Sequence, residues 1–348
     1  MSNSLPFRLT RCLALGSGLL VMTQTGAAQL APAPAPPPAP ASAASGAPDS
    51  AFPGIHENWT TPALTNSHLI PTRPLVVPSD MHKYTLELLQ VQWRPGDPID
   101  LYVMKPKGVK KPPVILYLNG YPTDTDIFKR PEYQELVTRD GVAAVGFVSE
   151  LTGHRYHDRP MKEWFISELQ ESLATSAHDV QMVLNYLDSR GDLDMNRVGM
   201  FTQGSGASIA ILASGVDPRI KVLEALDPWG DWPTWLAKTT LMPEDERPDY
   251  VKPEFLKNVA TLEPLDWLPK IQAKKFRLDQ ELFDKVTPKD AQDKLRAVVP
   301  AGSSVMLYKN MDEFKAAFED GKNLQWIQHE LESIPEPAET KPTPPSHK

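Results

Sequence analysis

The alternation of apolar and polar residues along the chain predicts strands that alternate with helices. Two extended runs, residues 84–93 and 99–104, flank a short stretch that contains Pro95, Gly96 and Pro98, which favours a hairpin. The uninterrupted apolar run at residues 114–118 is typical of a strand that is buried on both faces of a sheet.

The following segments continue this alternation. We expect further strands at residues 142–148, 197–201, 222–226, 276–278 and 305–308, and helices at residues 127–139, 163–190 and 207–214, with a mostly helical, proline-punctuated stretch at residues 238–270 that is a candidate lid. The predicted fold class is α/β: a mostly parallel, doubly wound sheet with an antiparallel N-terminal hairpin and a helical lid insertion.

The first residues have the pattern of a secretory signal peptide. Residues 1–28 place Arg8 and Arg11 before a short apolar run, and small residues precede a cleavage point after Ala28. The apolar run is too short to span a bilayer in the mature chain, although an uncleaved anchor is the alternative. We therefore expect a periplasmic or secreted protein without a transmembrane segment in its mature form.

Proline-rich segments flank the predicted domain. Residues 29–50 form a Pro- and Ala-rich linker, and residues 332–348 a Pro-rich tail that we expect to be disordered. Residues 51–331 remain as one folded domain.

Composition then excludes several classes of protein. The chain has 348 residues, a formal net charge of −8 and one cysteine, Cys12, inside the predicted signal peptide. One cysteine excludes a disulfide scaffold or a zinc finger, and a mature chain without a thiol excludes a cysteine nucleophile. The negative charge argues against a nucleic-acid surface, whereas a hydrophobic content of 41% is sufficient for a sizeable core.

Three motifs resemble those of the α/β-hydrolase superfamily, most closely the secreted esterases and peptidases related to dienelactone hydrolases and prolyl oligopeptidases. They are the strand end Leu118-Asn119-Gly120-Tyr121, the lead-in at residues 194–201, and the turn at residues 284–288. The resemblance spans residues 114–317 and implies the hydrolysis of carboxylic esters or peptides. It also implies oxyanion donors from the amides of Tyr121 and Ser205, and Asp284 as the catalytic acid.

The nucleophile motif of this superfamily, Gly-x-Ser-x-Gly, is altered in this chain. Alignment on the predicted strand places the motif on residues 202–206, so that Gly204 takes the nucleophile position. A slip by one residue makes Ser205 the nucleophile but places Gln203 and Ala207 where small residues are required. Otherwise Ser205 is a capping or first-turn residue of the following helix.

The histidine of the triad has no counterpart in the expected loop after the last strand. Asp312 or Glu313 stands there instead, and an exposed carboxylate is a weak base at neutral pH. His329 follows in a predicted terminal helix and is expected at the surface. The pair His178 and Asp179 is expected on one face of a helix.

Other residues are expected to border the pocket. His154 and His157 follow a strand end and form an incomplete metal-ligand pattern with Asp158, so a structural role is the alternative and we expect no metal. Trp229 and Trp232 follow another strand end, where they either form a pocket rim that stacks on a ligand or pack as part of a lid.

Three functions follow from these observations. The first is a non-catalytic member of the superfamily that binds a small acyl, peptide or glycan ligand or an envelope partner. The second is a serine hydrolase that uses Ser205 with an unrecognised base such as His154 or His157. The third is an envelope structural protein tethered by its proline-rich arms. None of them requires a cofactor or involves nucleic acid.

Overall fold

The computed structural model describes residues 57–65, 70–71, 75–94, 97–123, 125–151, 155 and 168–335. The predicted signal peptide and linker lie outside these residues, as does most of the predicted tail. No helix in the described part of the chain is both long and apolar enough to cross a bilayer.

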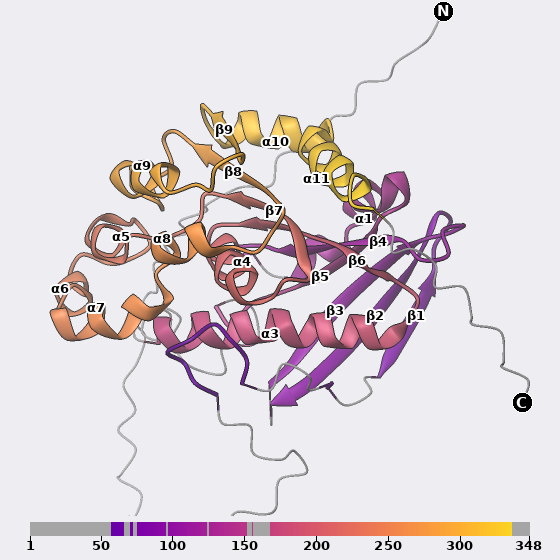
Figure 1. Cartoon of the computed structure of the whole chain (residues 1–348), viewed down its shortest axis with the longest axis horizontal. Helices are drawn as coiled ribbons and strands as arrows, with labels where there is room; N and C mark the ends of the chain where they lie inside the picture. Colours follow the sequence, from indigo (N-terminus) through magenta and orange to yellow (C-terminus); the bar gives the residue numbers. More distant parts are fainter. Residues whose placement is uncertain are drawn as a thin grey trace, which may run out of the picture. The chain divides into compact units, whose positions relative to one another are not determined.

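Nine strands form one sheet in the described residues (Figure 1). In chain order they are β1 (Val76–Asp80), β2 (Tyr84–Arg94), β3 (Asp97–Pro106), β4 (Pro113–Leu118), β5 (Ala143–Phe147), β6 (Asp194–Gln203), β7 (Ile220–Leu226), β8 (Lys275–Glu281) and β9 (Ser304–Tyr308). Their order across the sheet is β1-β2-β3-β5-β4-β6-β7-β8-β9. The first three strands and the β3–β5 pair are antiparallel, and all later pairs are parallel.

Helices connect the parallel strands. Among the described residues the α-helices are α1 (Pro131–Thr138), α3 (Leu169–Arg190), α4 (Ser205–Val216), α5 (Trp232–Lys238), α6 (Arg247–Tyr250), α7 (Pro253–Val259), α8 (Pro264–Trp267), α9 (Lys289–Ala297), α10 (Met311–Glu319) and α11 (Lys322–Glu332). Short 3-10 helices occur at η1 (Thr125–Lys129), η2 (Arg139–Gly141), η4 (Ala260–Leu262) and η5 (Leu268–Lys270).

The sheet separates two apolar layers, as expected for a doubly wound fold. Side chains of β4 alternate between them: Val114, Leu116 and Leu118 join the layer that contains α3 and α4, and Ile115 and Tyr117 join the layer of α1, α10 and α11. Figure 1 shows these two groups of helices on opposite faces of the sheet. Burial of β4 on both sides explains why its sequence is uniformly apolar.

The predicted hairpin, the buried strands and the helical stretch before β8 are confirmed. The prediction of one helix over residues 127–139 is wrong, because η1 ends at Lys129 and α1 begins anew at Pro131. Proline has no amide hydrogen to donate within a helix but suits the first helical position. The edge strand β1 is missing from the prediction. Helix α3 begins at Leu169, and the predicted start of this helix at residue 163 lies outside the described residues.

Candidate functional site

The turn after β6 leads from the strand into α4 through a single residue. Gly204 has φ 56° and ψ −123°, and α4 begins at the next residue, Ser205. The Gly204 amide donates to the carbonyl of Leu226 at 2.8 Å, while its carbonyl accepts from the amides of Ala207 and Ser208. Gly204 therefore stands at the tip of the turn, with a positive φ that favours glycine.

Close packing against the end of β4 explains two other glycines. A Cβ atom added to Gly206 would lie 2.2 Å from the carbonyl oxygen of Leu118, and one added to Gly120 would lie 2.6 Å from that of Gln203. At Gly204 the nearest atom would be Nε1 of Trp229, at 3.6 Å. The two turns thus require glycine at positions 120 and 206 for space, whereas position 204 has room for a side chain.

The Ser205 hydroxyl lies inside the molecule. Ser205 has an exposed fraction of 0%, and its Oγ accepts a hydrogen bond from the amide of Tyr121 at 2.9 Å. The backbone donor that was expected to bind a substrate oxygen therefore binds the hydroxyl of this serine. Within the described residues, no histidine is hydrogen-bonded to Ser205.

The carboxylate of Asp284 holds the turn that follows β8. Its Oδ1 accepts from the amide of Val286 at 2.9 Å and its Oδ2 from that of Thr287 at 2.8 Å. Asp284 is thus in the loop where the sequence motif expects the acid. No described residue links it to a histidine.

Asp227, at the end of β7, is a second carboxylate in this region that the motif analysis did not identify. It is buried, has φ 43°, and accepts the amide of Glu281 at 2.8 Å. Burial and the nearby charge of Asp284 raise the pKa of Asp227 well above its usual value, which favours its protonated form. An acidic residue directly after a buried strand was the available signal.

Glu313, in the expected histidine loop, caps a helix. Asn310 precedes α10 and its side chain accepts the amide of Glu313 at 3.0 Å, while the carboxylate of Glu313 accepts the amide of Lys309 at 2.6 Å. This pairing resembles a capping box, in which the two side chains satisfy free amides at a helix start. Asp312 is exposed in the same turn.

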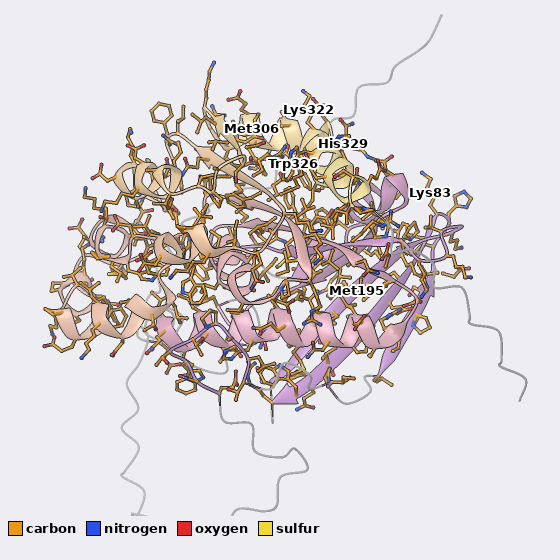
Figure 2. The ribbon with its side chains drawn as sticks, viewed as in Figure 1. Lys83, Met195, Met306, Lys322, Trp326 and His329 are labelled. Atoms are coloured by element: carbon orange, nitrogen blue, oxygen red, sulfur yellow. The ribbon has the colours of Figure 1, made fainter. Side chains whose placement is uncertain are left out.

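The histidines lie in different environments. His329 is exposed on α11, as predicted (Figure 2). His154 and His157 lie outside the described residues. His178 and Asp179 lie in the middle of α3, as expected, and both side chains are buried by other segments that pack against this helix.

Trp229 and Trp232 are buried rather than placed at an open rim, each with an exposed fraction of 1%. Trp229 stacks on Trp235 with ring centroids 4.7 Å apart, and Trp232 meets Trp235 edge-on at 5.8 Å. Glu263 accepts the amides of Asp231 and Trp232 and fixes the start of α5. The indoles pack in the core because they can bury a large apolar area there.

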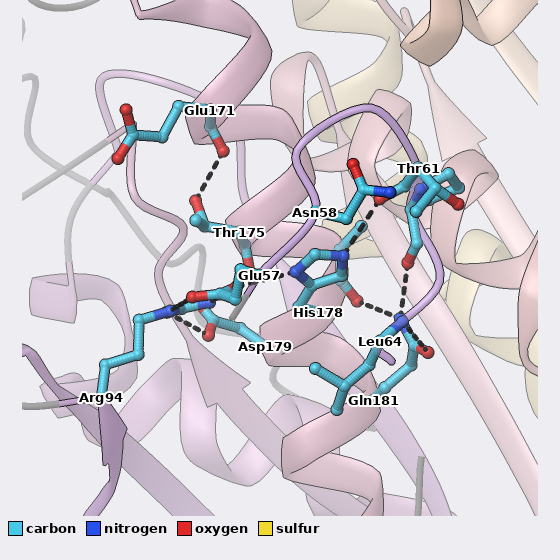
Figure 3. A network of polar contacts seen from close by, with 12 residues as sticks. Glu57, Asn58, Thr61, Leu64, Arg94, Glu171, Thr175, His178, Asp179 and Gln181 are labelled. Atoms are coloured by element: carbon cyan, nitrogen blue, oxygen red, sulfur yellow. Dashed lines mark hydrogen bonds and ion pairs between the residues drawn. The ribbon is translucent and has the colours of Figure 1, made fainter. Parts of the chain in front are cut away.

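His178 ties the first described residues to α3 (Figure 3). Its Nδ1 lies 2.7 Å from Oε1 of Glu57 and its Nε2 lies 3.0 Å from the carbonyl oxygen of Thr61. Gln181, one turn later, accepts the amide of Leu64 at 3.1 Å. Residues 57–64 therefore form a strap along α3, a name we keep for this segment below.

A buried charge network continues from the strap into the sheet. Arg94 binds Glu57 and Asp179, and Arg155 binds both Asp97 and Asp179 at 2.8 Å. Pairing between the charges offsets the desolvation that each would otherwise suffer on burial. Burial would raise the pKa of Asp97, yet the charge of Arg155 holds it well below its usual value.

Glu150 is the unusual carboxyl group of the network. Burial raises its pKa to about 8, despite the opposing charge of Arg155, whose Nη2 donates to it at 2.9 Å. Asp97 and Asp179 add like charge in the same direction. Glu150 is therefore mainly protonated at neutral pH.

In the part of the chain that is described, no three His, Cys, Asp or Glu side chains form a group that could hold a metal ion.

Solved structures share this arrangement of sheet and helices. An acetyl xylan esterase from Paenibacillus sp. R4 matches with a TM-score of 0.61 and 17% identity over 76% of this chain and 90% of that one. Acetyl xylan esterase 1 from Thermoanaerobacterium sp. JW/SL YS485 matches with a TM-score of 0.60 and 15% identity over 76% and 89%. The chain has the α/β-hydrolase fold.

A third structure, 2,6-dihydroxy-pseudo-oxynicotine hydrolase, has this α/β-hydrolase fold too, with a TM-score of 0.54 and 20% identity over 71% of this chain and 68% of that one. No model of a known protein family matches the sequence, and neither does any curated protein. In the α/β-hydrolase fold the nucleophile stands on the strand-to-helix turn that Gly204 occupies here.

Proposed function

We propose that this protein is an exported α/β-hydrolase-fold protein that binds a ligand or partner without hydrolysing it. The observation that carries the proposal is Gly204, which stands at the tip of the turn after β6 with a positive φ and no side chain. An acyl-transfer nucleophile at this turn needs a hydroxyl or thiol group, and position 204 supplies neither.

Two further observations support the proposal. The Ser205 hydroxyl is buried and bonded to the Tyr121 amide, so attack on a carbonyl would require it to leave this bond. The loop after β9 has Glu313 as a helix cap and contains no histidine. Serine without a base is a weak nucleophile, so each loss reinforces the other.

The retained acid turn favours the alternative, a serine hydrolase. Asp284 lies in the loop after β8 and accepts the amides of Val286 and Thr287 there. Such an enzyme would use Ser205 as nucleophile and His154 or His157 as base. Two of the similar structures are named acetyl xylan esterases, so acetylated glycans are suitable test compounds for both functions.

A fluorophosphonate probe, read by intact mass, separates the two functions. The full chain should remain unlabelled, and its turnover of p-nitrophenyl acetate should equal that of Ser205→Ala. Stoichiometric labelling that is lost in Ser205→Ala would establish the hydrolase instead. Calorimetry with acetylated and deacetylated xylo-oligosaccharides then tests binding, and we expect heat of binding from the acetylated form with no release of acetate.

A further inference from the structure

The outer side of β9 is an open sheet edge that the proposed function does not use. β9 is the last strand of the sheet, and no described element pairs with its outer side (Figure 1). Val305, Met306 and Leu307 are exposed by 37, 43 and 46%. The strand contains no charged residue and no proline, which are the features that commonly protect a sheet edge from pairing.

Apolar exposure continues from β9 into the turn that carries Asp284. The amide of Leu282 donates to the carbonyl of Tyr308 at 2.8 Å, which places this turn beside the end of β9. Phe283 follows with an exposed fraction of 74%. The strand and the turn together therefore make one apolar edge surface.

The hydrogen bond of Tyr308 also indicates which backbone groups face outward. Its carbonyl points toward β8. The backbone N–H and C=O groups of successive strand residues alternate between the two sides, so those of Met306 also point toward β8. Val305 and Leu307 therefore direct their amide hydrogens and carbonyl oxygens away from the sheet.

We propose that β9 pairs antiparallel with β9 of a second copy of this chain, about a two-fold axis at Met306. Val305 then lies opposite Leu307 of the second copy. Each such pair exchanges two N–H to C=O hydrogen bonds, because both residues direct their backbone groups outward. Met306 lies opposite itself as a non-hydrogen-bonded pair, and the two sheets join into one.

The charges and the symmetry of the strand favour a second copy as the occupant. In this register every cross-strand pair within β9 is uncharged, and Lys309 lies opposite Ser303 rather than another lysine. A strand that is self-complementary under a two-fold axis satisfies the requirement of a symmetric dimer interface.

The opposite edge of the sheet does not fit the same operation. Antiparallel pairing of β1 about its centre would place Pro78, which lacks an amide hydrogen, on the axis. It would also oppose Val76 to Asp80, an apolar residue to a charged one. Of the two edge strands of the sheet, β9 is thus suited to pairing with itself and β1 is not.

Engineered cysteines in the full chain test the register, with Cys12→Ser in every variant. Met306→Cys places two sulfur-bearing residues about 4.5 Å apart at Cα, which a disulfide can span. Val305→Cys is the matched control, because two copies of residue 305 lie more than about 7 Å apart, beyond disulfide reach. Under mild oxidation we expect Met306→Cys to form a disulfide-linked dimer and Val305→Cys to form no disulfide between the two copies. Equal cross-linking of both would overturn the register.

Sedimentation velocity tests the interface itself. The unmodified chain should show a concentration-dependent dimer. The double variant Val305→Lys, Leu307→Lys should sediment as a monomer, because it opposes lysines across the seam. Val77→Lys on β1 is the control, with an exposed fraction of 55% at the wild-type valine, and should dimerise as before. Far-UV circular dichroism verifies that each variant is folded. A wild-type monomer at high concentration, or a dimer that survives both lysines, would refute the proposal.

Discussion

Replacing Gly206 with alanine should destabilise the fold more than replacing Gly204, although the two glycines are only two residues apart. The added Cβ of Gly206→Ala would lie 2.2 Å from the backbone oxygen of Leu118. Carbon–oxygen contacts are normally about 3.3 Å or longer, so the helix and β4 must separate by about 1 Å. β4 is hydrogen-bonded on both sides and cannot move freely.

The expected magnitudes differ in size and cause. Overpacking of this kind destabilises a protein by about 1–3 kcal/mol or more, and we expect Gly206→Ala near the upper end. In Gly204→Ala the nearest atom is 3.6 Å away, so only the positive φ matters. Gly204 lies outside the left-handed helical region, and such rarely populated backbone costs a non-glycine residue about 1–3 kcal/mol, partly offset by the smaller conformational entropy of alanine in the unfolded chain.

Urea unfolding followed by tryptophan fluorescence measures both variants. Gly206→Ala should lower the free energy of unfolding more than Gly204→Ala does, with an unchanged m-value. Alanine normally stabilises a helix by about 1 kcal/mol relative to glycine, so the sign of the Gly206 effect is diagnostic. If Gly206→Ala were as stable as the wild type, the close approach of α4 to β4 would not be real.

Three further predictions concern the site and the charge network. The double variant Gly204→Ser, Glu313→His should hydrolyse p-nitrophenyl acetate only slowly if the pocket no longer accepts an ester substrate. Rapid hydrolysis would show that the pocket still accepts one. Between pH 4.5, the usual pKa of a glutamate, and about pH 8, Glu150 is protonated in the folded chain but ionised in the unfolded chain. The free energy of unfolding therefore falls as the pH rises through this window. The isosteric Glu150→Gln should remove that fall, seen as a stability gain over wild type that grows with pH in urea unfolding. His178→Ala should lower stability by about 2 kcal/mol and make the strap sensitive to limited proteolysis, whereas His329→Ala at the surface should change stability by less than about 0.5 kcal/mol.

Much of the fold could be predicted from the sequence because its strands are buried on both faces. Residues 114–118 are apolar without interruption, and that run becomes β4 at the centre of the sheet. β1 could not be predicted in this way, because all its residues are exposed and its sequence lacks an apolar face. The prediction of one helix across Pro131 was wrong because the helical spacing of apolar residues continues through this proline, although a new helix begins there.

At the site, local sequence predicted the turn but not its surroundings. The glycines around Ser205 indicated a strand-to-helix turn, and their spacing placed Gly204 at its tip. The bond between Tyr121 and Ser205 joins residues 84 positions apart, so no local pattern contained it. The same holds for His178, whose partner Glu57 lies 121 residues earlier. Long-range polar contacts of this kind need the fold before they can be recognised.

The attachment of Glu57 to α3 sets a limit on how far the chain can be shortened from its beginning. The guanidinium of Arg94 and the ring of His178 both bind the carboxylate of Glu57. Removal of the strap would leave these two largely buried groups without that partner. Recombinant fragments that start after residue 64 should therefore be poorly soluble, even though every strand of the sheet is retained. Any maturation protease that acts on this protein must stop before this anchor point to leave a stable product.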